Sequence, residues 1–483
     1  MNKFWICFTC VLSLAVALYA DDVPVRYVNV NNYDPNSSDY NSKSGCDGST
    51  YEKGFGTLAK AMRWANDLEA SHVIVGPGVY DKAVFGSNGR CSVQKGMLLE
   101  SMEGPEKTII VGAASDDASG MDANGNGPNA VRCVRIQQTG CTIRGFTITG
   151  GHTAISTDSM LGYGGAVWTD YNHGITDSRI ENCIITNNAA SQSVLFGGTY
   201  INCIIKDNYS TSRHAADSTE LINCLVTDNT ALRAASGTRL TVNCTFGPFT
   251  QINPNVDQSA CGYGSPAGPV VNSIFITRPD SLKSNTYIWL TNCFYISSAP
   301  HGQYEYNCRK FASAAAMGLD ENYRPIKDGA AVGFASNDVY NAYASGVGFT
   351  LDGVPRILNG NVDVGAYEYN WCNDFAAALG PEVVVTNASA EVTLDGSGHV
   401  VLPDGKSIAG YMATKPQCSL CILNASPEVA GTLYPANGSP AAVSGSVIKY
   451  TSRGQLGFDL LGVGSSLLGD FRRLFSGLKI KFY

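Results

Sequence analysis

Residues 180–188, Ile-Glu-Asn-Cys-Ile-Ile-Thr-Asn-Asn, form a short motif that recurs along the chain. Its copies read Ile-Asn-Cys-Ile-Ile-Lys-Asp-Asn at 201–208, Leu-Ile-Asn-Cys-Leu-Val-Thr-Asp-Asn at 221–229 and Leu-Thr-Val-Asn-Cys-Thr-Phe at 240–246. Their cysteines, Cys183, Cys203, Cys224 and Cys244, are 20, 21 and 20 residues apart. A period near 20, built from short apolar segments between Asn, Asp and Gly turns, indicates a parallel β-solenoid in which each period makes one coil.

The repeat extends in both directions and assigns a role to each position. Related strings are Ile143-Arg-Gly-Phe146-Thr-Ile148, Val271-Asn-Ser273-Ile-Phe-Ile276 and Leu290-Thr-Asn-Cys293-Phe-Tyr295. Because side chains alternate along a strand, each Cys and the apolar residue two places later should face the interior. The flanking Asn residues can turn the corners in the left-handed region and hydrogen-bond from coil to coil.

The repeated cysteines are expected to be small buried core residues rather than a disulfide ladder or a metal site, because their spacing is unlike any zinc motif. They are Cys183, Cys203, Cys224, Cys244 and Cys293. Disulfides, if present, would join the cysteines of the irregular regions, which are Cys46, Cys91, Cys261, Cys308, Cys372, Cys418 and Cys421.

The composition and the first residues place the protein outside the cell. With 44% hydrophobic and only 15% charged residues, the 483-residue chain is neither disordered nor a coiled coil. Met1–Ala20 has Lys3, an apolar run and a small-x-small end, which is typical of a secretory signal peptide. Removing it leaves a net charge of -9, so nucleic acid is an unsuitable partner. We expect a secreted or cell-surface protein with no further membrane-spanning helix.

Both ends of the solenoid should be capped. Thr57 is a suitable helix N-cap before Leu58, Ala61, Met62, Ala65 and Leu68, whose spacing predicts a short amphipathic helix over the first coil. We therefore divide the chain into a signal peptide (1–20), an N-terminal cap module (21–96), the solenoid with a closing motif (97–371) and a C-terminal module (372–483). Short Val- and Leu-rich runs in 372–483 predict a small β module, for which membrane or cell-wall attachment and a plain accessory role both stay open.

Three groups of motifs carry a family resemblance over about residues 25 to 370. Tyr27-Val-Asn29, Asp47-Gly48, Phe55-Gly-Thr-Leu58 and Ile74-Val-Gly-Pro-Gly-Val-Tyr80 resemble the N-terminal module of secreted bacterial β-helices of the pectin-lyase-like superfamily. The repeats, with Gly164-Gly-Ala-Val167, resemble those of polymorphic outer-membrane proteins, and residues 351–369 resemble the closing motif of β-helices that carry interchangeable C-terminal anchors.

The resemblance implies an all-β, right-handed parallel β-helix with an N-terminal helical cap and a small C-terminal β module. It implies a polysaccharide partner held in a groove, but it does not choose a chemistry, because the superfamily includes lyases, hydrolases, epimerases and non-enzymatic adhesins.

Two long insertions are expected to form the walls of such a groove. They occupy residues 150–166 and 247–269 and begin directly after the third strand of their coils, at Gly150 and Gly247. They should leave from the same corner, separated by three coils. The column of residues eleven places before the cysteines would form the floor and face solvent: Asn172, Gln192, Arg213 and Arg233.

Two stacked arginines on an acidic protein suit the carboxylates or sulfates of an anionic glycan, although a solvated sheet face also carries polar residues. The neighbouring column, His173, Ser193, His214 and Ala234, would face inward. A register shifted by one residue would exchange the two columns and expose His173 and His214.

The catalytic signals are weak. Val167-Trp-Thr-Asp170-Tyr-Asn-His173 faintly resembles a pectate-lyase strand motif, with Tyr171 where that motif has His. The candidates are Asp170, His173, Asp177, Arg213 and His214. Two functions stay open: an adhesin-like protein that binds an extended anionic polysaccharide or surface partner without turnover, or a polysaccharide lyase or glycoside hydrolase acting between the two loops.

One string suggests a metal. Asp122-Ala-Asn124-Gly-Asn126-Gly127 matches the first half of a calcium loop, in which alternate oxygen ligands converge. The bidentate Glu expected at the twelfth place is Cys133, which excludes an EF-hand. A structural Ca²⁺ site and an ordinary Asn-Gly turn both remain possible, and no other cofactor is expected.

Overall fold

The computed structural model describes residues 25–67, 72–84, 89–93, 96–158, 160–171, 174–253, 261–262, 268–276, 289–296, 304–352, 356–357, 361–369 and seven short strands beyond residue 392. The predicted signal peptide, residues 1–20, lies outside them. Among the described residues no helix is both long enough and apolar enough to cross a membrane.

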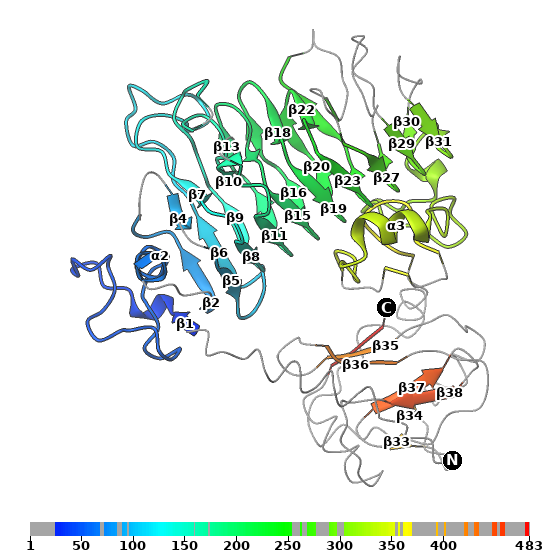
Figure 1. Ribbon diagram of the computed structural model, residues 1–483, viewed down its shortest axis with the longest axis horizontal. Helices are drawn as coiled ribbons and strands as arrows, with labels where there is room; N and C mark the ends of the chain where they lie inside the picture. The colour runs from blue at the N-terminus through cyan, green and yellow to red at the C-terminus, as the bar shows by residue number, and fades with distance from the viewer. Residues whose placement is uncertain are drawn as a thin grey trace, which may run out of the picture.

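The chain folds as a right-handed parallel β-helix, as the repeat predicts (Figure 1). Each regular coil contributes one strand to each of four sheets, which we call first to fourth in the order the chain visits them. Neighbouring coils pair in parallel throughout, for example Ile180 with Tyr200 and Tyr200 with Leu221.

The first sheet has 11 described strands: β1 (Val25–Val28), β2 (His72–Val75), β5 (Leu98–Ser101), β8 (Thr142–Arg144), β11 (Arg179–Glu181), β15 (Thr199–Ile201), β19 (Glu220–Ile222), β23 (Leu240–Val242), β27 (Val270–Val271), β29 (Trp289–Thr291) and β31 (Tyr304–Tyr306). The second has 10: β3 (Gly78–Tyr80), β6 (Thr108–Val111), β9 (Thr147–Thr149), β12 (Ile184–Thr186), β16 (Ile204–Lys206), β20 (Leu225–Thr227), β24 (Thr245–Phe246), β28 (Ile274–Phe275), β30 (Phe294–Ile296) and β32 (Arg309–Phe311).

The third sheet has four described strands: β13 (Ala189–Ala190), β17 (Tyr209–Ser210), β21 (Asn229–Ala231) and β25 (Phe249–Gln251). The fourth has seven: β4 (Gly89–Val93), β7 (Arg132–Ile136), β10 (Val167–Thr169), β14 (Leu195–Phe196), β18 (His214–Asp217), β22 (Arg233–Ser236) and β26 (Cys261–Gly262).

Asparagine makes the corners in two ways. Between the first and second sheets, one Asn per coil adopts a φ between 51° and 53°, at positions 182, 202, 223, 243, 272, 292 and 307. Between the second and third sheets, Asn188, Asn208 and Asn229 stack as a buried amide ladder, in which each side chain donates to the next at 3.0 and 2.9 Å. Both predicted roles of the repeated Asn are confirmed.

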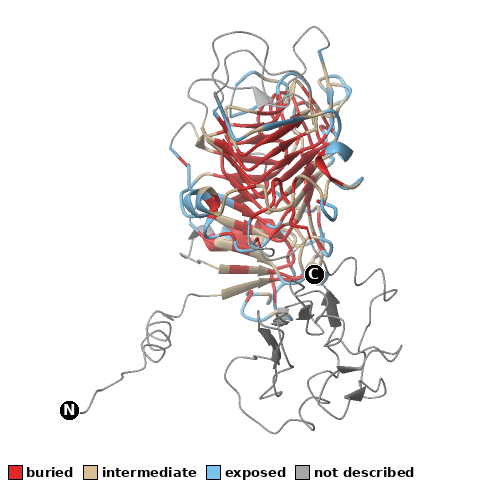
Figure 2. Ribbon diagram, turned by 90° about the vertical axis from the view of Figure 1, so that its right-hand side faces the viewer, coloured by how far each residue is buried: buried red, intermediate tan, exposed pale blue. Residues whose placement is uncertain are grey.

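The repeated cysteines are buried and free, as expected. Figure 2 shows that buried residues concentrate inside the stacked coils. Three sequence assignments to irregular regions are wrong. Cys91 lies in β4 and Cys261 in β26, and Cys308 belongs to the repeated column, because its Sγ accepts a hydrogen bond from the Cys293 N–H at 3.3 Å. Cys46 and Cys91 are also free, whereas Cys372 and Cys418 lie outside the described residues.

The two ends of the solenoid are closed differently. At the N-terminal end, helix α2 (Leu58–Asp67) packs Leu58, Met62 and Ala65 on the core, and Thr57 caps it by accepting the Lys60 N–H at 3.2 Å. Leu68 lies outside the described residues. At the other end, Glu305 follows Leu290 and Lys310 follows Tyr295 in the last coil. Both are exposed, so charged side chains end the apolar stack of the core.

A segment between residues 311 and 369 folds back over the outer faces of the first and second sheets. It includes the 3₁₀ turn η3 (Ala315–Met317) and helix α3 (Asn337–Ala344). A further 3₁₀ turn, η1 (Val30–Asn32), lies near the N-terminus. Tyr340 and Val364 of the segment at 311–369 share a buried cluster with the outward Ile222 and Val242. Figure 1 shows α3 beside the late coils. The motif at 351–369 thus lies along the side of the late coils.

Beyond residue 392 the described strands pair antiparallel. They are β33 (Thr393–Leu394) with β34 (Val400–Val401), β35 (Leu420–Leu423) with β36 (Val429–Leu433) and β39 (Lys479–Phe482), and β37 (Val447–Thr451) with β38 (Gln455–Phe458). These pairs form the small C-terminal β module that the sequence predicted.

Candidate functional site

The outer face of the fourth sheet lies between the strands that follow the two insertions, although residues 254–260 and 263–267 of the second insertion lie outside the described residues. Strands β14, β18 and β22 lie between β10 and β26, the strands next to which the insertions return. Both insertions begin later than predicted. Gly151 still stacks on the next coil, donating to Asn188 Oδ1 at 2.9 Å, and β25 occupies a regular third-sheet position after Gly247. Both therefore leave between the third and fourth sheets, on one side of the solenoid.

The expected arginine stack does not form. Arg213 Nε donates to Gln192 Oε1 at 3.1 Å, so these two residues are neighbours as predicted, but Arg233 pairs in register with His214. The cause is the corner before the first sheet, which has two residues after Asp217 and three after Ser236. This extra residue shifts β22 by one position relative to a count from the cysteines.

The other predicted site residues are scattered. Arg213 is exposed, Gln192 is buried and Arg233 is half-buried, whereas Asn172 and His173 lie outside the described residues. Asp170 is half-buried at the end of β10. Asp177 is exposed at the corner before β11, where its carboxylate accepts the Gly140 N–H at 3.0 Å.

His214 is buried beside two arginines. Burial, and then the charges of Arg233 and Arg213, lower the pKa of the imidazole to about 3. The ring is therefore neutral at pH 7, and its Nδ1 is buried without a hydrogen-bond partner in the described structure. At 6% exposure it is not placed to meet a polymer on the surface.

An aromatic cluster on this face was not identified from the sequence. Tyr163 from the first insertion packs on Phe196 with ring centroids 4.9 Å apart, and Tyr171 meets the same ring edge-on at 6.2 Å. Trp168 lies beside Phe196 in the register of β10 and β14. The alternation of side chains could have predicted the cluster, because Trp168 and Phe196 each follow an inward apolar residue and must point outward.

Three arginines cover these rings. The guanidinium carbons of Arg213, Arg135 and Arg239 lie 5.6, 4.9 and 5.2 Å from the ring centroids of Tyr163, Trp168 and Tyr171, respectively. Such cation–π contacts hold a guanidinium plane in place while leaving its N–H donors available at the rim. Of the three, Arg213 is exposed, whereas Arg135 is buried and the Arg239 guanidinium lies 3.5 Å from the Glu220 carboxylate.

Asp217 is the buried carboxylate of this face and was also missed. It continues the column of Trp168 and Phe196, and its two oxygens accept the hydroxyls of Ser193 and Ser218, both at 3.0 Å. Burial raises the pKa of Asp217, an effect that these hydroxyls and Arg213 partly offset. The carboxylate is thus occupied by neutral donors rather than by an ion pair.

The loop predicted to hold calcium forms a hydrogen-bonded turn. Asp122 Oδ1 accepts the backbone N–H groups of Asn124 and Asn126, each at 2.9 Å, and its Oδ2 accepts Asn126 Nδ2 at 3.0 Å and Thr211 Oγ1 at 3.3 Å. Within the described residues, His, Cys, Asp and Glu form no group of three suited to a metal. A Ca²⁺ ion would have to displace these donors, and calcium binding stays a prediction.

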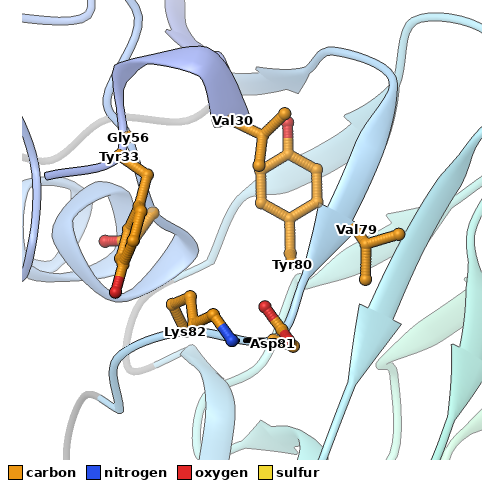
Figure 3. Close-up of a pocket in the computed structure, with 8 residues that line it drawn as sticks. Val30, Tyr33, Gly56, Val79, Tyr80, Asp81 and Lys82 are labelled. Atoms are coloured by element: carbon orange, nitrogen blue, oxygen red, sulfur yellow. Dashed lines mark hydrogen bonds and ion pairs between the residues drawn. The ribbon is translucent and has the colours of Figure 1, made fainter. Parts of the chain in front are cut away.

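A small pocket lies at the N-terminal cap, away from this face (Figure 3). Its cavity of about 130 Å³ is walled by Val30, Tyr33, Val79 and Tyr80, with the Asp81–Lys82 ion pair at its edge. Pockets that enclose organic ligands usually exceed about 300 Å³. This cavity is too small for a polysaccharide.

No family model matches the sequence, and no curated protein matches it either. Among solved structures, the chain is similar to a pectate lyase with a TM-score of 0.36 and 10% identity, over 72% of this chain and 96% of the other. It is also similar to a pectin methylesterase variant in complex with a hexasaccharide, with a TM-score of 0.27 and 11% identity, over 57% and 90% of the two chains. The β-helix assignment rests on the strand pairing of this chain itself.

Proposed function

We propose that this protein binds an extended anionic polysaccharide across the outer face of the fourth sheet without turning it over. The observation that carries the proposal is the placement of Arg213. Its guanidinium is exposed, held by Gln192 and stacked on Tyr163, and no carboxylate of the described residues lies within ion-pair distance. A guanidinium held in this way can receive a carboxylate or sulfate through two parallel hydrogen bonds.

The surroundings of Arg213 favour an anionic ligand. Arg135 is buried on the same face, and Asp217 is buried with its oxygens engaged by serines. The insertions leave the solenoid on the same side of this surface, which suits a polymer that lies along it. The overall acidity of the chain opposes nonspecific attraction of polyanions, so recognition would depend on this local cluster.

Turnover is not supported by the arrangement of the candidate groups. A two-carboxylate hydrolase needs its acids about 5 to 9.5 Å apart on one face. Asp170 is half-buried at the end of β10, and Asp177 lies at a corner. Asp217 and His214 are buried, and His173 lies outside the described residues. We further propose that the protein acts outside the cell, on a glycan or cell-surface partner, and that residues 372–483 serve attachment.

Binding is tested with polygalacturonate, alginate, sulfated dextran and, as a neutral control, cellulose oligomers, using calorimetry at two salt concentrations. The wild type should bind an anionic polymer and lose affinity in salt. Arg213→Ala should weaken binding by about 10- to 100-fold, the loss expected when a charged hydrogen-bonding group is removed. Lys206→Ala, on the second sheet, is the matched control and should leave binding unchanged.

Turnover is tested on the same polymers by following reducing ends and the ultraviolet absorbance of unsaturated uronates. Release of product that Arg213→Ala abolishes would overturn the binding-only proposal and establish a lyase or hydrolase. Binding that is equally strong to neutral polymers, or that Lys206→Ala weakens as much as Arg213→Ala, would reject this face as the anionic site.

A further inference from the structure

We infer that Arg132 is the positioning residue of this face: its buried guanidinium fixes the turn at residues 160–163 and thereby places Tyr163 beneath Arg213. The inference deepens the proposed function and rests on it for the binding part alone. Arg132 begins β7, one coil before β10, and does not touch the surface itself, being 3% exposed.

Arg132 binds three backbone carbonyls of the turn. Nε donates to Tyr163 O at 2.9 Å, and Nη2 donates to Met160 O and Leu161 O, both at 2.7 Å. These carbonyls leave the regular coil and have no strand beside them, so they need another donor when buried. One planar guanidinium has enough donors in a fixed geometry to satisfy all three.

The opposite side of the turn is held by the next coil. Gly162 O accepts the Gln192 N–H at 2.9 Å, and Gly164 N donates to Ser193 O at 2.7 Å. The turn is therefore clamped between Arg132 and residues 191–193, and each side satisfies a different set of its backbone groups. Because Gln192 also binds Arg213, the clamp and the cation share a partner.

The consequence reaches the surface through Tyr163. The ring of Tyr163 packs on Phe196 at 4.9 Å and carries the Arg213 guanidinium at 5.6 Å. Loss of Arg132 leaves three carbonyls without donors, which favours a turn conformation that exposes them to water. Tyr163 moves with that turn, and Arg213 loses the ring that orients it.

The chain offers a matched control one coil earlier. Arg90, on β4 of the same sheet, is 5% exposed and also caps carbonyls, those of Val111 at 2.7 Å and Gly112 at 3.4 Å. Its hydrogen bonds among the described residues reach the carbonyls of Ala83, Val111 and Gly112, and none reaches residues 160–163. A substitution at Arg90 therefore removes a similar set of buried hydrogen bonds without touching the wall of the face.

The experiment compares Arg132→Gln, Arg90→Gln, Arg213→Ala and the Arg132→Gln/Arg213→Ala double variant, by hydrogen exchange and by affinity for polygalacturonate and sulfated dextran. Arg132→Gln should speed exchange at Leu161, Gly162 and Gly164 by about tenfold or more and weaken binding about as much as Arg213→Ala. The double variant should bind no more weakly than Arg213→Ala alone, because both changes remove one coupled interaction.

Arg90→Gln should change neither the affinity for the polymers nor the hydrogen exchange of Leu161, Gly162 and Gly164, whatever it does to the melting temperature. Should Arg132→Gln fail to fold, Arg132→Lys and Tyr163→Ala take its place: the first should loosen the turn in part, the second should weaken binding with the turn still protected. Unchanged exchange in the turn, or equal loss of affinity in Arg90→Gln, would overturn the inference. If the wild type binds no anionic polymer, the proposed function fails, while the exchange results still decide the role of Arg132 in the turn.

Discussion

Arg356 Nε lies 3.3 Å from Glu368 Oε1, and both side chains are completely buried. The same guanidinium donates to Asp363 O at 3.0 Å and to Gly365 O at 2.5 Å, while Glu368 accepts the Asp363 N–H at 3.0 Å. The pair thus ties together the segment that covers the outer faces of the late coils. The segment is also bound to the solenoid, where Gly365 N donates to Asn272 O at 2.9 Å and Ala366 N to Thr245 Oγ1 at 3.0 Å.

Replacement of Arg356 by Met should destabilise this covering segment strongly. Removing Arg356 leaves Glu368 buried without its ion-pair partner, and breaking a buried pair in this way costs about 3 to 5 kcal/mol. Urea unfolding measures the loss of stability, and hydrogen exchange of the native protein shows whether residues 361–369 become less protected. Arg324→Met is the control, because its pair with Asp352 is partly exposed and should contribute no more than about 1 kcal/mol. Equal losses in the two variants would contradict the assignment of the buried pair as the anchor.

The same segment should make stability depend on pH. Burial raises the pKa of Asp363 from 3.8 to about 6, and burial also raises the pKa of Glu368. The folded protein therefore holds protons that the unfolded chain has lost. The contribution of Asp363 to the unfolding free energy is full below pH 4, falls as the pH rises through 6 and is constant above it. Denaturant titrations at intervals between pH 4 and 7 should show this decline, and Asp363→Asn should reduce it. A decline of undiminished size in Asp363→Asn would assign the effect to other groups.

Substitutions in the buried amide ladder should lower the free energy of unfolding more than substitutions at the exposed left-handed Asn residues of the corners. Asn208 is buried and donates to Asn229 Oδ1, Ile185 O and Lys206 O, each at 2.9 Å. Asn208→Ala leaves these acceptors unpaired and should cost about 2 kcal/mol or more, measured by urea unfolding.

Asn187 is the control for the ladder. It is exposed with a φ of 53°, and Gly takes this conformation without strain, so Asn187→Gly should be close to neutral. A neutral Asn208→Ala would show that the ladder adds little to the stacking of the coils.

The parts of the fold that the sequence predicted are those that repeat locally. The inward cysteines, the left-handed Asn corners and the capping helix follow from side-chain alternation and turn chemistry within one coil. The register of β22 could not be counted, because one extra corner residue between Ser236 and Leu240 is invisible to a count from the cysteines. The strands of the last coil, β31 and β32, were not predicted, because Glu305 and Lys310 stand at positions that are apolar in the earlier coils.

Only the part of the candidate site that lies on the repeat could be predicted from the sequence. Arg213 and Gln192 lie on the repeat and were found together, as the alternation predicts. Tyr163 and Arg132 act through an insertion whose path is set by tertiary hydrogen bonds, and no periodicity reports such contacts. Asp217 was missed although the alternation places it in the outward column of β18, whose register with β14 was predicted correctly.

The repeated thiols should be chemically silent in the folded protein. Cys203 and Cys244 are completely buried, and burial raises the pKa of both well above the usual range, whereas Cys46 and Cys308 are partly exposed. Alkylation of the native protein followed by peptide mass spectrometry should label Cys46 and Cys308 first and the buried thiols only after unfolding. Early labelling of Cys203 would mean that the coils open locally.

Replacement of Asp217 by Asn should strengthen binding of an anionic polymer. The carboxylate continues the outward column of the face and lies near Arg213, so its charge opposes an incoming carboxylate or sulfate. Asparagine keeps an oxygen for the Ser193 hydroxyl and removes the charge, which with water-like screening at about 4 Å is worth about 1 kcal/mol, or roughly fivefold in affinity. Asp177→Asn, at the exposed corner, should leave affinity unchanged. Calorimetry with polygalacturonate at low salt compares the three proteins, and weaker binding by Asp217→Asn would place the polymer elsewhere, because removing a negative charge can only favour an anion that lies on this face.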